Sequence, residues 1–137
     1  MKKRTSMVLI ALLLVAVIMT FLTGGGNIRN AERILGESSL YTQREIEAAM
    51  DVAVNRFRRN FDDCKLLRIA YDEEKTLSEQ EYQKEKYGKD EIIVLVSDFY
   101  VGNHAEPTFS PNQTYKNWKW ILEKSAFGWK LIGTGYA

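Results

Sequence analysis

Residues 109–136 read FSPNQTYKNWKWILEKSAFGWKLIGTGY and contain all three tryptophans of the chain. A Pro-Asn pair, which favours a turn, precedes a first strand pattern, and a short turn around Gly128 separates that pattern from a second one. Two strand patterns joined by a short turn predict an antiparallel hairpin. We call residues 109–136 the tryptophan hairpin, and we expect the other elements of the chain to cover it.

The two strands of this hairpin are predicted to carry one aromatic face. Trp118, Trp120 and Leu122 fall on the same side of the first strand, because side chains alternate along a strand. Indole rings could bind a sugar or a cation through their faces, but tryptophans in a small sheet more often form the core beneath a helix. We therefore expect a core element, with Trp118 and Trp120 kept as candidate binding residues. Gly133 and Gly135 could open a pocket beside them.

A long helix is predicted to pack on that face. Thr42 and Glu45 form a capping box, which starts the helix at Gln43. Apolar residues then recur every three or four positions and give one continuous stripe. The stripe consists of Ile46, Met50, Ala53, Val54, Phe57 and Phe61.

Two further strands are predicted before the hairpin. Residues 64–71 alternate, with Leu67, Ile69 and Tyr71 on one face. Residues 92–101 are the most apolar run after the N-terminal segment, which is typical of a strand covered on both faces.

Two short helices complete the expected fold. Residues 30–36 favour one or two helical turns, and Ser78 with Glu81 marks a capping box for a surface helix that Gly88 ends. The predicted fold class is α+β, with a long amphipathic helix packed on a curved antiparallel sheet of about four strands. We expect an N-terminal hydrophobic helix before a domain that covers residues 40–137, with residues 27–39 as a linker or short helix.

The N-terminal residues 1–26 have the layout of an export signal. A basic cluster at residues 2–4 precedes residues 7–22, which carry no charge. As a helix this run would span about 24 Å, enough to anchor the chain in a membrane with help from its flanking residues. The alternative is a cleaved signal peptide, with cleavage near Gly25 and secretion of the domain.

Two further features concern the placement of the domain. The basic cluster should remain in the cytoplasm, so the expected location is the cell membrane, crossed once, with the domain facing outward. Three consecutive glycines predict a flexible joint at residues 24–27.

Composition excludes several classes of function. Without residues 1–26 the chain has 16 basic and 18 acidic residues, a net charge of 16 − 18 = −2, which does not favour nucleic-acid binding. Cys64 is the only cysteine, so no internal disulfide can form. His104 and Glu106 share a loop, but two ligands do not define a metal site. We expect no metal, no cofactor and no nucleic-acid partner.

Asp98 is the candidate catalytic residue. It is the only charge in the apolar run of residues 92–101, so its carboxylate is the acid expected to lie nearest the core. Burial would raise its pKa, and a neighbouring cation or amide would lower it. With His104 or Tyr115 it could act as a general acid or base, although a water-exposed acid near the sheet edge is the more common outcome.

The hairpin sequence also resembles a known family. The motif is Pro-Asn-x-Thr-Tyr-x-x-Trp-x-Trp, here formed by Pro111, Asn112, Thr114, Tyr115, Trp118 and Trp120. It is similar to a core motif of small exported proteins of Gram-positive bacteria that are classed as a domain of unknown function, and the similarity covers residues 40–137. The order of elements resembles the nuclear transport factor 2-like (cystatin-like) cone. The resemblance implies a fold and an export context, but no activity, cofactor or catalytic residue.

Three functions remain open at this level. No set of residues has the spacing of a known reaction centre, which favours a non-catalytic, membrane-tethered module that binds an unknown protein or small molecule. Its candidate binding residues are Asn112, Thr114, Tyr115, Trp118 and Trp120. One alternative is a small acid-base enzyme with Asp98 in a cone-shaped pocket, and another is a structural component of a cell-envelope assembly.

Overall fold

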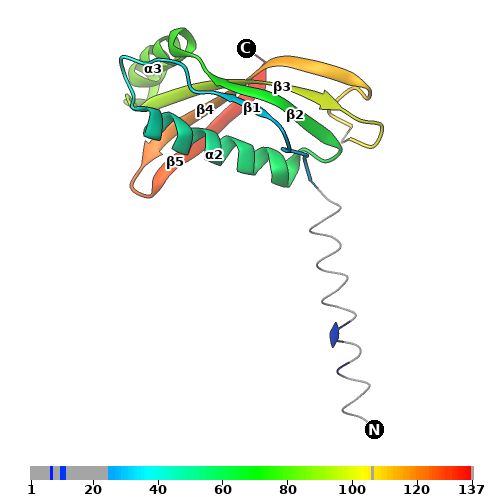
Figure 1. The fold of residues 1–137 in the computed structure, drawn as a ribbon. Helices are drawn as coiled ribbons and strands as arrows, with labels where there is room; N and C mark the ends of the chain where they lie inside the picture. Colours follow the sequence, from blue (N-terminus) through cyan, green and yellow to red (C-terminus); the bar gives the residue numbers. More distant parts are fainter. Residues whose placement is uncertain (1–6, 8–9, 12–24, 106, 137) are drawn as a thin grey trace.

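The computed structural model describes residues 7, 10–11, 25–105 and 107–136 (Figure 1). Most of the expected anchor at residues 7–22 therefore lies outside the described residues, and so do Glu106 and most of the expected cleavage site. Within the described part of the chain, no helix is long and apolar enough to cross a membrane.

Within the residues that the structure describes from 25 onward, the fold is α+β, as predicted, with one mixed sheet and two helices. The elements are β1 (Glu32–Ile34), α2 (Gln43–Asn60), β2 (Cys64–Tyr71), α3 (Glu73–Tyr87), β3 (Ile92–Val101), β4 (Gln113–Ser125) and β5 (Gly128–Tyr136). The sheet has five strands in the order β1-β2-β3-β4-β5. β1 runs parallel to β2, whereas the other neighbours are antiparallel. The expectation of about four antiparallel strands was therefore wrong by one parallel edge strand.

α2 begins at Gln43 and carries the predicted capping box. The hydroxyl of Thr42 accepts a hydrogen bond from the Glu45 backbone N–H, and the Glu45 carboxylate accepts one from the Thr42 backbone N–H. The whole predicted stripe is buried and packs against the sheet. Figure 1 shows α2 lying along one face of the sheet.

The tryptophan hairpin is confirmed as β4 and β5, joined by a turn at residues 126–127. Trp120 and Leu122 are fully buried in the core beneath α2, and Trp118 packs partly buried against the same core. The Trp120 indole N–H donates to the Ser97 hydroxyl at 2.8 Å, so its single polar atom is satisfied within the core. The prediction of a core element is confirmed.

β3 is covered on both faces, as predicted. Ile93 and Leu95 belong to the core under α2. On the other face Val94 is also fully buried, next to α3. There the buried Thr76 hydroxyl of α3 accepts a hydrogen bond from the Val94 backbone N–H at 3.0 Å. α3 therefore provides a hydrogen bond that a neighbouring strand would otherwise provide near the start of β3.

Two predicted helix positions were wrong. Residues 30–36 contain β1 instead of helical turns, because Arg33 pairs with Ile69 of β2 and this long-range pairing overrides the local pattern. α3 begins at Glu73 rather than after Ser78, because the Asp72 carboxylate accepts the Lys75 backbone N–H at 2.9 Å and caps the helix earlier.

The predicted inward face of β2 was wrong at one position. The register with β3 shifts between Leu66 and Arg68, and a bulge of this kind reverses which side chains face the core. Leu66 is therefore buried, whereas Leu67 is 38% exposed. Ile69 and Tyr71 face inward as expected.

Candidate functional site

Asp98 is fastened between two neighbouring strands. The Arg68 guanidinium on β2 donates to its carboxylate at 2.7 Å, and the Asn117 backbone N–H on β4 donates at 2.9 Å. Burial raises the pKa of Asp98, but the hydrogen bonds from Asn117 and Arg68 and the charge of Arg68 outweigh it, so the pKa lies below its ordinary value. A carboxylate held in its ionised form is a poor proton acceptor near neutral pH.

The orientation of Asp98 separates it from the tryptophans. Ser97 precedes Asp98 on β3, and Ile69 follows Arg68 on β2. The side chains of Ser97 and Ile69 point into the core beneath α2. Because side chains alternate, Arg68 and Asp98 point to the opposite face of the sheet. The structure thus does not bring the candidate catalytic residue together with Trp120.

Two of the predicted binding residues of the 110–115 turn, Tyr115 and Asn112, hold the turn in place, whereas Thr114 does not. The Tyr115 ring is buried and stacks on Phe99 with 5.3 Å between ring centroids. Its hydroxyl accepts the Ser110 backbone N–H at 2.9 Å, which lowers the pKa of Tyr115. Asn112 accepts from the Tyr100 hydroxyl at 3.3 Å, and Thr114 is exposed on the surface.

Trp118 lies in an aromatic cluster next to this turn. Its ring meets Phe109 and Tyr136 edge to face, with centroids 5.6 Å and 5.3 Å away, and its indole N–H donates to Thr134. The structure therefore brings these aromatic residues into one packed cluster, because Tyr115 contacts Trp118 and both Trp118 and Trp120 contact Phe61.

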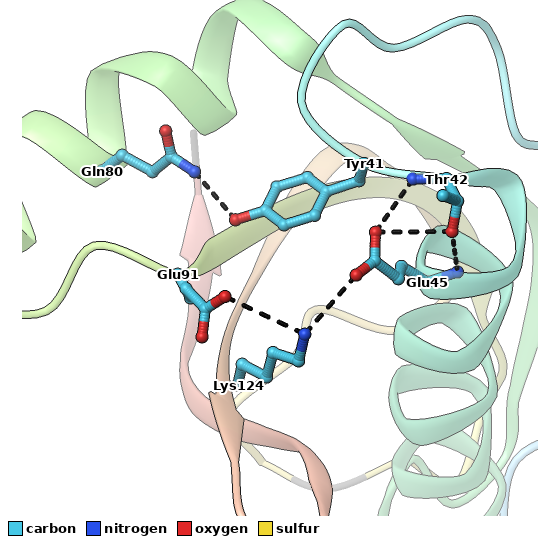
Figure 2. A network of polar contacts seen from close by, with 6 residues as sticks. All are labelled: Tyr41, Thr42, Glu45, Gln80, Glu91 and Lys124. Carbon is cyan, nitrogen blue, oxygen red and sulfur yellow. Dashed lines mark hydrogen bonds and ion pairs between the residues drawn. The ribbon is translucent and has the colours of Figure 1, made fainter.

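A second polar group lies at the start of α2, and we call it the Lys124 network (Figure 2). The Lys124 ammonium lies 3.5 Å from a Glu45 carboxylate oxygen and 3.8 Å from one of Glu91. Beside it, the Gln80 side-chain amide donates to the Tyr41 hydroxyl at 2.8 Å. These contacts join the hairpin to α2, α3 and the start of β3. Every charge in the network has a partner, which indicates a structural role.

An open pocket of about 880 Å³ lies at the other end of α2. Its walls come from residues 25–29, Arg58, residues 62–65, Tyr100 and the loop after β3. Between Glu45 in the Lys124 network and Arg58 lie 58 − 45 = 13 helical steps, or about 20 Å at 1.5 Å per residue. Asp98 and the three tryptophans do not line this pocket.

Two glycines form one wall of the pocket and dock on the last turn of α2. The Gly26 N–H donates to the Arg58 carbonyl at 2.9 Å, and the Gly25 N–H donates to the Asp62 carboxylate at 2.9 Å. A Cβ atom at Gly25 would lie 2.0 Å from the Arg58 carbonyl oxygen, and Gly25 has φ +91°. Only glycine allows this approach. We call Gly25 and Gly26 the glycine clamp.

The chain remains attached to the fold after the clamp. The Asn27 N–H donates to the Cys64 carbonyl at 2.8 Å, and the Asn27 carbonyl accepts from the Leu66 N–H at 2.8 Å. Asn27 thus extends the parallel pairing of β1 with β2. The expected flexible joint at residues 24–27 is therefore wrong for its described residues, because hydrogen bonds hold Gly25, Gly26 and Asn27 to the domain.

The pocket carries cations from three different segments: Arg29, Arg58 and Lys65. Arg58 donates to the Asn55 side chain at 2.8 Å. Arg29 and Lys65 are exposed and form no ion pair with any residue that the structure describes. Their charges are available to a ligand.

The two carboxylates of the pocket have structural partners. Asp62 receives the Gly25 N–H, and Asp63 receives the His104 backbone N–H at 2.7 Å. The Asp63 carboxylate also lies against Gly102, where a Cβ atom would come within 2.4 Å of it. The aspartates therefore fasten the pocket walls to each other.

The sequence reasoning did not find this site. It treated the glycines as a joint. Glycine often marks a position where another backbone segment comes close, and this property could have indicated the site. It was considered only for Gly133 and Gly135. Those two glycines line no part of this pocket.

Within residues 7, 10–11, 25–105 and 107–136, no cluster of three or more His, Cys, Asp or Glu side chains could hold a metal ion.

The chain matches no protein-family model, no curated protein and no solved structure. The family resemblance therefore rests on its motif residues.

Proposed function

We propose that this protein is a membrane-tethered, outward-facing, non-catalytic binding module whose ligand site is the pocket beside the glycine clamp. The observation that carries this proposal is the clamp itself. Leu22 ends the apolar run, and Gly25 follows it after 25 − 22 = 3 steps along the chain, which limits the distance between their Cα atoms to about 11 Å. The clamp therefore keeps the pocket close to the end of the apolar run.

The clamp also favours an anchor over a cleaved signal. A peptidase needs the chain around its cleavage site to be accessible and extended, whereas in the folded domain the Gly26 N–H is bonded to the Arg58 carbonyl of α2 and the Gly25 N–H to the Asp62 carboxylate just after the helix. The basic cluster at residues 2–4 then supports an outward orientation of the domain, in agreement with the export context that the family resemblance implies.

The finer fold in this proposal is a cystatin-like cone. Register shifts in β2, β3 and β4 support it, since bulges bend a sheet and increase its twist. Trp120 and Leu122 fill the face beneath α2, so the ligand site of this module lies outside the cone, at the end of α2. The acid-base alternative is disfavoured by the ion pair that holds Asp98.

Cell fractionation with surface labelling tests the proposal. Phe127 in the β4–β5 turn is fully exposed, whereas Cys64 is buried, so a Phe127→Cys variant offers one reactive thiol to a maleimide that does not cross membranes. We expect the full-length chain in the membrane fraction, with labelling of intact cells, and the wild-type protein serves as the unlabelled control.

Two results would contradict the proposal. Labelling only after lysis would place the domain inside the cell, and an intact mass that lacks residues 1–25 would show cleavage instead of anchoring. The structural-component alternative predicts the same location, but it requires a stable protein partner that co-purifies from detergent extracts.

A further inference from the structure

We propose that the pocket beside the glycine clamp binds the phosphate of an anionic phospholipid headgroup from the same membrane. This inference rests on the proposed membrane tether for the position of the pocket. Its chemical basis is independent of the tether, since it depends on the cations that line the pocket.

The cations of the pocket match a phosphate ligand. Arg29 comes from the segment after the clamp, Arg58 from α2 and Lys65 from β2, and all three line the same space. Arginine offers a planar fork of donors that fits phosphate oxygens, and lysine adds a compact charge. Arg29 and Lys65 have no carboxylate partner among the described residues, so a ligand does not need to break an existing ion pair.

The balance of charge favours a phosphodiester over a more highly charged anion. Among the residues that the structure describes, the lining contains three cations, Arg29, Arg58 and Lys65, and two carboxylates, Asp62 and Asp63, which leaves 3 − 2 = +1. A phosphodiester headgroup such as that of phosphatidylglycerol carries one negative charge. The aspartates are held by backbone N–H groups of Gly25 and His104, so they remain at the walls.

The position of the pocket selects a lipid as the source of that phosphate. Gly25 lies within about 11 Å of the end of the apolar run, and phosphate groups occupy the boundary between hydrocarbon and water. Tyr100, 40% exposed, forms part of the pocket wall, and tyrosine is enriched at this boundary. The tether also raises the local concentration of headgroups, so even a weak site would be occupied.

Calorimetric titration of the full chain in micelles of an uncharged detergent tests this site. The probes are dihexanoyl phosphatidylglycerol, dihexanoyl phosphatidylcholine and inorganic phosphate. We expect saturable binding of phosphatidylglycerol only. Replacing two cations, Arg29→Gln with Lys65→Gln, should weaken that binding on the order of 10- to 30-fold.

A matched variant, Arg44→Gln with Lys130→Gln, removes the same charge away from the pocket. Neither residue lines the pocket or forms an ion pair with a described residue, so its binding should equal that of the wild type. Equal weakening in both variants would overturn the site in favour of general electrostatic attraction. Equal or stronger binding of inorganic phosphate would overturn the lipid assignment, and absence of binding by all probes would overturn the phosphate site.

The titration separates this inference from the proposed function. It uses purified protein in micelles, so its outcome does not depend on where the cell places the domain. A cytoplasmic location with intact binding would refute the proposed function, whereas a membrane location without binding would refute the lipid site alone.

Discussion

Gly25→Ala should undock the N-terminal segment from α2. The new Cβ would lie 2.0 Å from the Arg58 carbonyl oxygen, and this oxygen belongs to the helix backbone, so it cannot move aside as a side chain would. The segment must therefore leave its place and lose the two clamp hydrogen bonds, from Gly25 to Asp62 and from Gly26 to Arg58. At about 1 kcal/mol for each bond, plus the strain of alanine at positive φ in any partly docked state, we expect a loss of about 2 to 3 kcal/mol in the free energy of unfolding.

Gly36→Ala is the matched control. Gly36 also has positive φ, +64°, but a Cβ atom at this position would meet no atom within 4 Å beyond its chain neighbours. Alanine there adds only the strain of the left-handed conformation, about 1 kcal/mol. The difference between the two variants therefore isolates the contact with α2.

Urea unfolding of the full chain, followed by circular dichroism, measures both losses, and hydrogen exchange reports the Gly26 amide directly. We expect this amide to be protected in the wild type and in Gly36→Ala, and to exchange freely in Gly25→Ala. Equal losses of stability in the two variants, or a Gly26 amide that already exchanges freely in the wild type, would refute the clamp.

Substitutions at three further positions test the polar contacts of the fold by urea unfolding. Asp98→Asn should cost about 1 to 2 kcal/mol at pH 7. Because folding lowers the pKa of Asp98, this stabilisation is fully present above the unfolded pKa of about 4, decreases as the pH falls below that value and is lost below the folded pKa. A pH-independent loss would contradict this prediction. Thr76→Val should cost about 1 to 3 kcal/mol by leaving the Val94 N–H unpaired. Thr76→Ser keeps the hydroxyl and should keep most of the stability. Equal losses in the two variants would show that the hydroxyl does not stabilise the fold. Lys124→Met should cost less than about 0.5 kcal/mol, because its ion pairs are partly exposed; a larger loss would show that the network contributes more than its geometry implies.

The parts of the fold that the sequence predicts are those specified by local pattern. Thr42 and Glu45 define the start of α2 through contacts three residues apart, and the stripe below them repeats with the helical period. The tryptophan hairpin is also local, since its strands are joined by a two-residue turn at residues 126–127. α2 and the tryptophan hairpin each have an apolar face that must be covered, so these faces are buried.

The parts that the sequence does not predict depend on distant contacts. β1 has only three residues, all exposed, and its strand conformation comes from pairing with Arg68, Ile69 and Ala70. The few side chains that α3 buries are polar, and the helix has no strong apolar stripe, so only capping residues could indicate where it begins. Asp72, and not Ser78, caps the helix. The exposed Leu67 results from a bulge that pairing with β3 creates.

The candidate site was missed for a related reason. Consecutive glycines are compatible both with a flexible joint and with tight backbone packing, and only the position of α2 decides between them. Asp98 was recognised as the acid nearest the core, yet its partner Arg68 lies 98 − 68 = 30 residues away. Sequence alone therefore identified the group but could not give the sign of its pKa shift.

The central claim is that the clamp fixes the domain with its pocket against the membrane, and fluorescence quenching by headgroup-labelled nitroxide lipids tests it most directly. A fluorophore is attached to Lys65→Cys at the pocket or to Phe127→Cys at the hairpin turn, each in a Cys64→Ala background, with the full chain in phosphatidylcholine vesicles that contain phosphatidylglycerol. The turn lies near the start of α2 (Figure 1), whereas the pocket lies near its end, and these two ends of the helix are about 20 Å apart. The account predicts strong quenching at position 65 and weak quenching at position 127, whereas equal quenching at both positions would show a freely tumbling domain and contradict it.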